Sequence, residues 1–258
     1  MLRKLIGGLA TALLFSTGAI AGTTVLEGSD ATTFHGAQPG GAVYVAQLFG
    51  YLKSDSSFNT KPVLVICEAG CPPAPAGTVY VTQAAFGAVV LGTDYSAVYV
   101  TSPGGCCSER ILSVADQTKI KAFTDAGGSV AIQDYQGGSA TLLGFDAPQT
   151  ELAGLVTGGL GGPGCFDTEI FLPAALSKGF TQPPALGCWG HQAYDMDYFG
   201  ALGFVSLVSS GPQFAGLGSG VFSSFLVKGG ALGDIPTPAT ALLAGLGLLG
   251  VYASRRRA

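Results

Sequence analysis

The sequence predicts an α/β fold: an open, mostly parallel sheet in three layers, followed by an irregular, glycine-rich second half. Two continuous apolar runs of strand length, 62–67 and 95–101, are typical of strands covered on both faces. A helical pattern over 113–127 separates the second run from a further strand at 129–133, which makes a right-handed parallel βαβ unit. Charged residues form only 11% of the 258 positions, so apolar side chains suffice for one large core.

Local signals place the remaining elements of the first half. Thr23 to Leu26 is a short strand candidate, and Tyr44 to Leu52 carries apolar residues at helical spacing. Ser113 is the expected N-cap of the 113–127 helix, with Asp116 three residues later as in a capping box. Gly127-Gly128 is expected to end that helix in the left-handed conformation.

The second half gives weaker signals. Five glycines within 158–164 predict a loop. The segments 203–208 and 221–226 have the composition of strands. With no internal repeat and no linker inside it, the region 22–234 is expected to form one domain.

The N-terminus has the layout of a secretory signal over residues 1–21. Arg3 and Lys4 are followed by an uncharged stretch from Leu5 to Ile20, and Ala19 and Ala21 supply the small residues of a cleavage site. We therefore expect signal peptidase to cut after Ala21, which exports the rest of the chain.

The C-terminus, 235–258, has three parts in a fixed order. Two prolines stiffen the tetrapeptide Ile235, Pro236, Thr237, Pro238, and an uncharged stretch over 239–253 follows. As a helix it measures about 22 Å, short for a membrane span but sufficient for a thinned bilayer. The cluster Arg255, Arg256, Arg257 would hold the end on the cytoplasmic side.

This tail resembles the PEP-CTERM sorting signal of Gram-negative bacteria. The resemblance implies recognition by an exosortase, a membrane protease that cuts near the proline motif, and release to the cell surface or the extracellular space. Carriers of the signal are commonly associated with exopolysaccharide and biofilm loci. The family's motif has Glu between the prolines where this chain has Thr237, which implies slower or variant processing. The alternative is an ordinary tail anchor in the inner membrane.

The stretch from Asp94 to Val130 resembles class I glutamine-amidotransferase-like domains, which belong with the flavodoxin-like α/β folds. In the enzymes of that family a nucleophilic Cys lies on a glycine-flanked elbow after a strand. Here Cys106 follows Pro103-Gly104-Gly105, but the glycine expected after the nucleophile is missing. The residue two positions after His191 is Ala193 instead of an acid. The resemblance therefore implies a non-catalytic relative.

Six cysteines lie between the two terminal segments, and an even number in an exported chain favours disulfides. They are Cys67, Cys71, Cys106, Cys107, Cys165 and Cys188. Proximity favours the pairs 67–71 and 165–188, which leaves 106 and 107 vicinal or free. Redox and metal roles are disfavoured, because the first pair lacks C-x-x-C spacing and zinc needs four convergent ligands. We expect no metal and no cofactor.

One local cluster is a candidate ligand site: Trp189, His191, Tyr194, Asp195 and Asp197. The aromatic rings could stack on sugars, the acids could bind hydroxyl groups or a cation, and the imidazole could act as a base near neutral pH. The alternative is that the rings pack in the core and the acids face water.

Two functional hypotheses follow. The first is an exported, non-enzymatic surface or matrix protein with exopolysaccharide as partner. The second is a secreted hydrolase that acts on polysaccharide or peptide through His191 and nearby acids. A carboxylate and a Ser or Cys at a strand end, both within reach of His191, would favour the second. The exported region has a formal charge of −9, which argues against nucleic acid as a partner.

Overall fold

A seven-stranded mixed sheet organises the chain in the computed structural model, which describes residues 22–73, 75–104, 110–133, 170–182, 189–191, 194–209 and 222–229. The elements are β1 (Thr23–Glu27), α1 (Pro39–Ser54), β2 (Val63–Ile66), β3 (Val79–Val81), α2 (Gln83–Phe86), β4 (Ala97–Val100), α3 (Val114–Asp125), β5 (Ser129–Gln133), β6 (Ile170–Phe171), α6 (Pro173–Ser177), β7 (Tyr194–Asp195), α7 (Met196–Ala201), β8 (Val205–Ser206), β9 (Val208–Ser209), β10 (Phe222–Ser223) and β11 (Phe225–Gly229).

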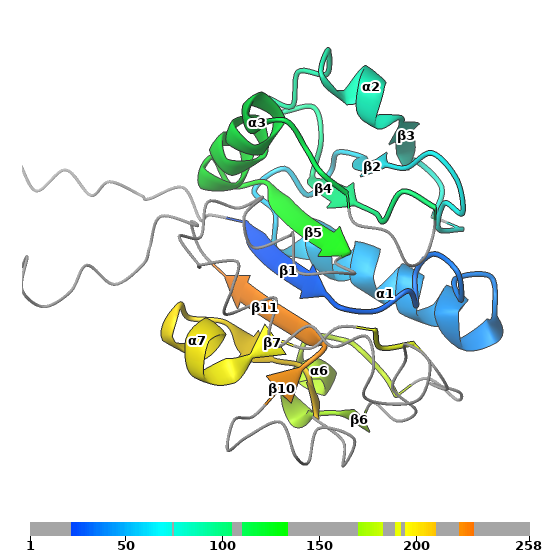
Figure 1. The fold of residues 1–258 in the computed structure, drawn as a ribbon, viewed down its shortest axis with the longest axis vertical. Coiled ribbons are helices and arrows are strands. Elements are labelled where there is room, and N and C mark those ends of the chain that lie inside the picture. Colours follow the sequence, from blue (N-terminus) through cyan, green and yellow to red (C-terminus); the bar gives the residue numbers. More distant parts are fainter. Residues whose placement is uncertain are drawn as a thin grey trace, which may run out of the picture.

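The strand order in the large sheet is β3-β2-β4-β5-β1-β11-β8. The five strands from β3 to β1 are parallel, whereas β11 runs antiparallel to both of its neighbours. The α/β class and the mostly parallel sheet expected from the sequence are thus confirmed. Figure 1 shows β11 beside β1, so the last described strand of the chain joins the sheet that the strands of the first half form.

Helices pack on both faces of this sheet. Leu48 and Leu52 of α1 share one apolar cluster with Val65 of β2, and Phe123 of α3 shares a second cluster with Leu64 of β2. Adjacent residues of a strand point to opposite faces, so a strand buried on both sides is expected to be predominantly apolar. This explains the unbroken runs in the sequence, and Figure 1 shows α1 and α3 on different sides of the sheet.

The helix over 113–127 forms largely as predicted. Ser113 caps α3, since its hydroxyl accepts a hydrogen bond from the Asp116 N–H. Gly127 has φ +103°, a conformation that favours glycine, and it follows the last turn. The Lys119 ammonium of this helix donates to the carbonyls of Phe86 and Gly87.

The described parts of the second half differ from the two continuous strands predicted there. The segment 203–208 divides at Leu207 into β8, in the large sheet, and β9, which pairs with β6. The segment 221–226 divides at Ser224 into β10, which pairs with β7, and β11. Short strands change sheets here, which a pattern of alternating residues does not reveal. The predicted loop at 158–164 lies outside the described residues.

Candidate functional site

Polar side chains gather at the carboxyl edge of the parallel strands. Glu27 ends β1 and pairs in register with Gln133, the last residue of β5. Thr101 and Ser102 directly follow β4 and are buried. Ligands of open α/β sheets bind at this edge, because the loops there leave the sheet in different directions. The edge is therefore the first place to look for a site.

Glu27 is fully buried, and hydroxyl groups satisfy its carboxylate. The Tyr99 hydroxyl donates to Oε2 at 2.7 Å, and Ser29 donates to Oε1 at 3.1 Å. The Thr32 hydroxyl in turn contacts that of Tyr99. Burial, together with the adjacent Glu27 carboxylate, raises the pKa of Tyr99 well above its ordinary value of 10.0. Tyr99 therefore stays protonated and remains a donor.

The Gln133 side chain, at the end of β5, forms hydrogen bonds to the loop after β1 and to the end of β4 at the same edge. Its amide nitrogen donates to the Ser29 carbonyl at 2.9 Å and to the Thr33 hydroxyl at 2.7 Å. Its amide oxygen accepts the Ser102 N–H at 2.9 Å. The loop after β1 is thus fixed to the ends of β4 and β5, so the side chains that it carries have defined positions.

Asp30, in that loop, meets two imidazoles. His191 Nε2 lies 3.0 Å from Asp30 Oδ2, and His35 Nε2 lies 3.5 Å from Asp30 Oδ1. The side chains are 2% exposed for Asp30, 8% for His191 and 12% for His35. A buried carboxylate needs hydrogen-bond donors or a cation. The two rings are the nearby groups that could supply them, although Asp30 Oδ1 makes no hydrogen bond to a described residue in this structure.

Backbone pairing brings His191 to this position. Ser29 and Gly190 form an isolated antiparallel bridge. The His191 N–H donates to the Gly28 carbonyl at 2.7 Å, and the Asp30 N–H donates to the Trp189 carbonyl at 3.0 Å. The segment 189–191 therefore lies beside the chain as it leaves β1, although 161 positions separate Asp30 from His191 in the sequence.

The structure separates the five residues of the predicted ligand cluster. Trp189 belongs to the apolar cluster under α1, and its ring lies 6.1 Å from that of Tyr44. Tyr194 is buried in the cluster on the opposite face of the sheet. Asp197 is exposed on α7, and the side chain of Asp195 lies outside the described residues. His191 reaches the carboxyl edge, where it meets Asp30, and the Trp189 ring lies 6.2 Å from that of His35.

A disulfide joins Cys67 and Cys71, at the end of β2, the first of the two pairs that spacing favoured. Next to it, Arg110 is buried and donates to both oxygens of Glu68, to Gln83 and to the Thr101 carbonyl. Cys106, Cys107, Cys165 and Cys188 lie outside the described residues, so their pairing stays a prediction.

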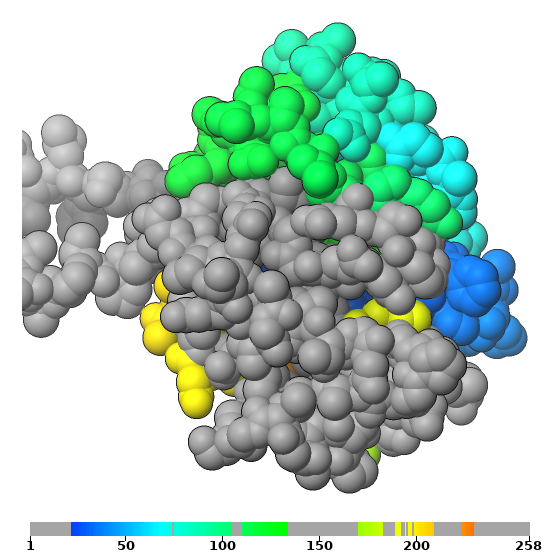
Figure 2. Space-filling model, in the orientation of Figure 1, coloured from blue at the N-terminus to red at the C-terminus, as the bar shows by residue number. Residues whose placement is uncertain are grey.

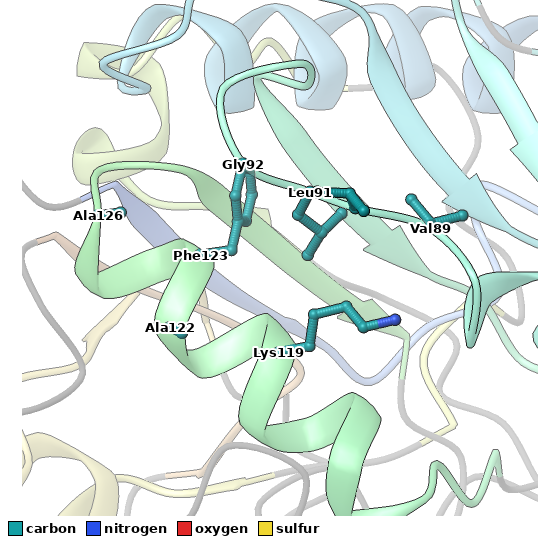
Figure 3. Close-up of a pocket in the computed structure, with 8 residues that line it drawn as sticks. Val89, Leu91, Gly92, Lys119, Ala122, Phe123 and Ala126 are labelled. Carbon is teal, nitrogen blue, oxygen red and sulfur yellow. The ribbon is translucent and has the colours of Figure 1, made fainter.

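A hollow of about 400 Å³ lies between α3 and the loop before β4 (Figure 3). Its walls are apolar, from Val89 to Leu91 on the loop and from Ala122 to Ala126 on the helix. Lys119 is at its rim, but the ammonium already bonds two carbonyls and the Asp116 carboxylate. In the space-filling view α3 and the α2 region form one continuous surface (Figure 2). The hollow therefore lacks the convergent polar groups of a reactive site.

Several predictions concern parts of the chain beyond the described residues. The signal residues Ala19 and Ala21 and the tail residues 235–258, with the predicted short transmembrane helix, are among them. Within the described residues no helix is long and apolar enough to cross a membrane. The same residues include no group of three or more potential ligands arranged to hold a metal ion.

No family model matches the chain, and no curated protein or solved structure shows significant similarity to it. The site is therefore described from its own geometry. Sequence reasoning missed Glu27, Asp30 and His35, although one signal was present. All three closely follow or end an apolar strand, and polar residues at the carboxyl ends of parallel strands meet at one edge.

Proposed function

We propose that this chain is an exported protein of the bacterial envelope that is sorted through its C-terminal tail. Signal peptidase would cut after Ala21. An exosortase would then cut near Pro236–Pro238, so that a transient inner-membrane form becomes a cell-surface or extracellular protein. The observation that carries the proposal is the fixed order of proline motif, short apolar stretch and arginine cluster over 235–257, behind an N-terminal signal.

The position of the sheet supports this division of the chain. β1 begins at Thr23, directly after the expected cleavage site, and β11 ends at Gly229, before the tail. Thr23 and Gly229 are register partners in adjacent strands. The first residue of β1 and the last residue of β11 therefore lie at the same edge of the sheet, opposite to the edge that carries Asp30. Processing at either end would leave these strands intact.

We infer a non-enzymatic role for the body, with exopolysaccharide as its partner. The hydroxyl groups nearest the Asp30 cluster already have partners: Ser29 bonds Glu27, Thr32 contacts Tyr99, and Thr33 accepts from Gln133. A nucleophile needs a hydrogen bond to a base instead. Helices on both sheet faces also support, as a proposal, the finer resemblance to a non-catalytic amidotransferase-like domain with flavodoxin-like layers.

The sorting proposal is tested by replacing Arg255, Arg256 and Arg257 with Ala and measuring the intact mass and location of the product. We expect uncut protein to accumulate in the membrane, because the positive charges that hold the tail are gone. A variant with Ala at Lys53, Lys61 and Lys121 removes three charges from the body and should be processed normally. Normal processing of the arginine variant would refute the proposal.

A second test uses the departure from the family motif. Thr237→Glu restores the carboxylate between the prolines, so processing should become faster if the protease binds that group. Pulse-chase labelling in cells that contain an exosortase measures the rate. Thr60→Glu, at an exposed position of the body, is the matched control and should leave the rate unchanged.

A secreted hydrolase is the second candidate function, and one observation favours it. His191 Nε2 lies 3.0 Å from a buried carboxylate at the carboxyl edge of the sheet. A carboxylate within reach of His191 is one part of the arrangement expected of such an enzyme. The hypothesis predicts that purified protein cleaves a polysaccharide or peptide and that His191→Gln abolishes the cleavage.

A further inference from the structure

The chain contains only two histidines, and both face the same carboxylate. One comes from the loop after β1, and the other comes from the distant segment 189–191. Each ring meets a different oxygen of Asp30, and each does so through Nε2. Three side chains that the hydrolase hypothesis did not connect therefore form one group, with the carboxylate in the middle.

The position of Nε2 determines where the proton of each neutral ring lies. A neutral imidazole carries one N–H, and the ring nitrogen that faces a carboxylate is the one that keeps the proton. The other nitrogen, Nδ1, is then left with its lone pair. In His35 this atom is buried and makes no hydrogen bond to any described residue, and Asp30 Oδ1, 3.5 Å from His35 Nε2, likewise makes none in this structure. A buried polar atom without a partner is a feature of sites that bind or react.

We propose that Asp30, His35 and His191 form one acid–base unit, in which Asp30 holds both rings as Nε2–H and His35 supplies Nδ1 as a base. Asp30 and His191 are positioning residues: the carboxylate orients His35, and His191 braces the carboxylate from the other side. The inference rests on the hydrolase candidate function, since it assigns roles within that site.

The chemistry favours esters or amides over glycosidic bonds as substrates. Glycosidases use two carboxyl groups that flank the bond, and the second carboxylate here is Glu27. Both of its oxygens already accept hydrogen bonds, from Tyr99 and Ser29, and the residue is fully buried. An imidazole base oriented by a carboxylate is instead suited to acyl transfer to water.

The proposed step balances without a cofactor. His35 Nδ1 takes a proton from water while the water oxygen bonds to the acyl carbon. The bond from that carbon to the leaving oxygen or nitrogen then breaks. The proton on Nδ1 passes to the leaving group, so the unit ends the cycle as it began. Contacts at a base commonly shorten and align only when substrate is bound, which suits the 3.5 Å separation of Asp30 and His35.

Phe34 lies beside His35. Its side chain is 66% exposed, and its ring meets that of His35 edge to face at 5.0 Å. Of the three side chains in the unit, His35 is the most exposed, at 12%. Substrate would reach Nδ1 by displacing the Phe34 ring, which has few neighbours to hold it.

Nitrogen NMR of the full chain labelled with ¹⁵N-histidine tests the unit independently of activity. With only two rings, the spectrum is simple to assign. At about pH 9, where histidine is neutral, both rings should be Nε2–H tautomers. Asp30→Asn should mix the tautomers of both rings, whereas Asp125→Asn, on the exposed face of α3, should change neither. The proposal would be overturned by an Nδ1–H tautomer at His35, or by ring tautomers that stay the same in Asp30→Asn.

An assay of p-nitrophenyl acetate hydrolysis then tests the hydrolase function separately from the acid–base unit. We expect His35→Gln to lower the rate on the order of 100-fold, and Asp30→Asn to lower it while changing the pH profile. Circular dichroism checks that each variant is folded. If the tautomers are as expected but the native chain does not hydrolyse the ester, the hydrolase function fails and the acid–base unit stands. If the ester is hydrolysed and His35→Gln is fully active, the assignment of the base fails.

Discussion

At the scale of single residues, buried polar groups at the carboxyl edge depend on specific donors. Glu27 is the clearest case, because its carboxylate is fully buried and Tyr99 supplies one of its donors. Tyr99→Phe removes that donor from a fully buried carboxylate. We expect the free energy of unfolding to fall by about 1–3 kcal/mol, measured by urea denaturation at neutral pH. An unchanged midpoint would show that Glu27 is neutral or has another donor.

Tyr99 also predicts how the fold responds to alkali. Its pKa is raised in the folded state, so the unfolded chain loses the phenolic proton first. Stability is therefore complete below about pH 10 and falls as the pH rises above it. Unfolding monitored at several alkaline pH values should show this loss, and Tyr99→Phe should make the dependence shallower. If stability fell more steeply with rising pH in Tyr99→Phe than in the native chain, the role given to Tyr99 would be contradicted.

Glu68 gives the opposite dependence, in acid. Hydrogen bonds from Arg110 hold the pKa of its carboxyl below the usual value. Its contribution is therefore present above the unfolded pKa and is lost as the pH falls through the lower, folded value. Glu68→Gln should reduce stability at pH 7 by on the order of 1 kcal/mol, since water screens a partly exposed pair. The variant's stability should also depend less on pH in the acidic range. Asp125→Asn, which breaks an exposed pair with Lys121, should have a smaller effect.

At the scale of elements, the sequence was most informative where local signals and burial agreed. Ser113 caps α3, and the apolar runs around Leu64 and Val98 form β2 and β4, because strands buried on both faces are predominantly apolar. The short strands after residue 170 were less predictable. β8 and β9 are adjacent in the chain yet pair in different sheets, and the choice depends on partners that no local pattern encodes.

The junction between α3 and β5 is closely packed. A Cβ at Gly128 would lie 2.1–2.4 Å from ring atoms of Phe123, which is buried. Gly128→Ala should therefore destabilise the fold by about 1–3 kcal/mol through overpacking. Gly50→Ala is the matched control: it lies within α1 with nothing within 4 Å of the added Cβ. That substitution should be neutral or stabilising by up to about 1 kcal/mol. Equal thermal midpoints for the two variants would contradict this packing.

At the scale of the molecule, the candidate site arises from contacts that the sequence does not display. The sequence indicated that His191 could act as a base, but not that the carboxylate beside it belongs to Asp30. The two residues meet because the bridge between Ser29 and Gly190 aligns their segments. Proximity in the sequence instead suggested Tyr194 and Asp197, which the fold directs elsewhere. A site made from distant segments becomes predictable only once the strand order is known.

The same whole-molecule view predicts that the domain is independent of its terminal segments. β1 lies between β5 and β11, and its first residue is tied into the domain: the Thr23 N–H donates to the Ser129 hydroxyl, and the Thr23 hydroxyl donates to Asp55. A chain of residues 22–234 keeps all of these bonds and should unfold in urea with the midpoint of the full chain. A chain that begins at residue 26 loses most of a central strand and should not fold. A lower midpoint for 22–234 would mean that a terminal segment stabilises the domain, and the division of the chain into a body and two sorting segments would then be wrong.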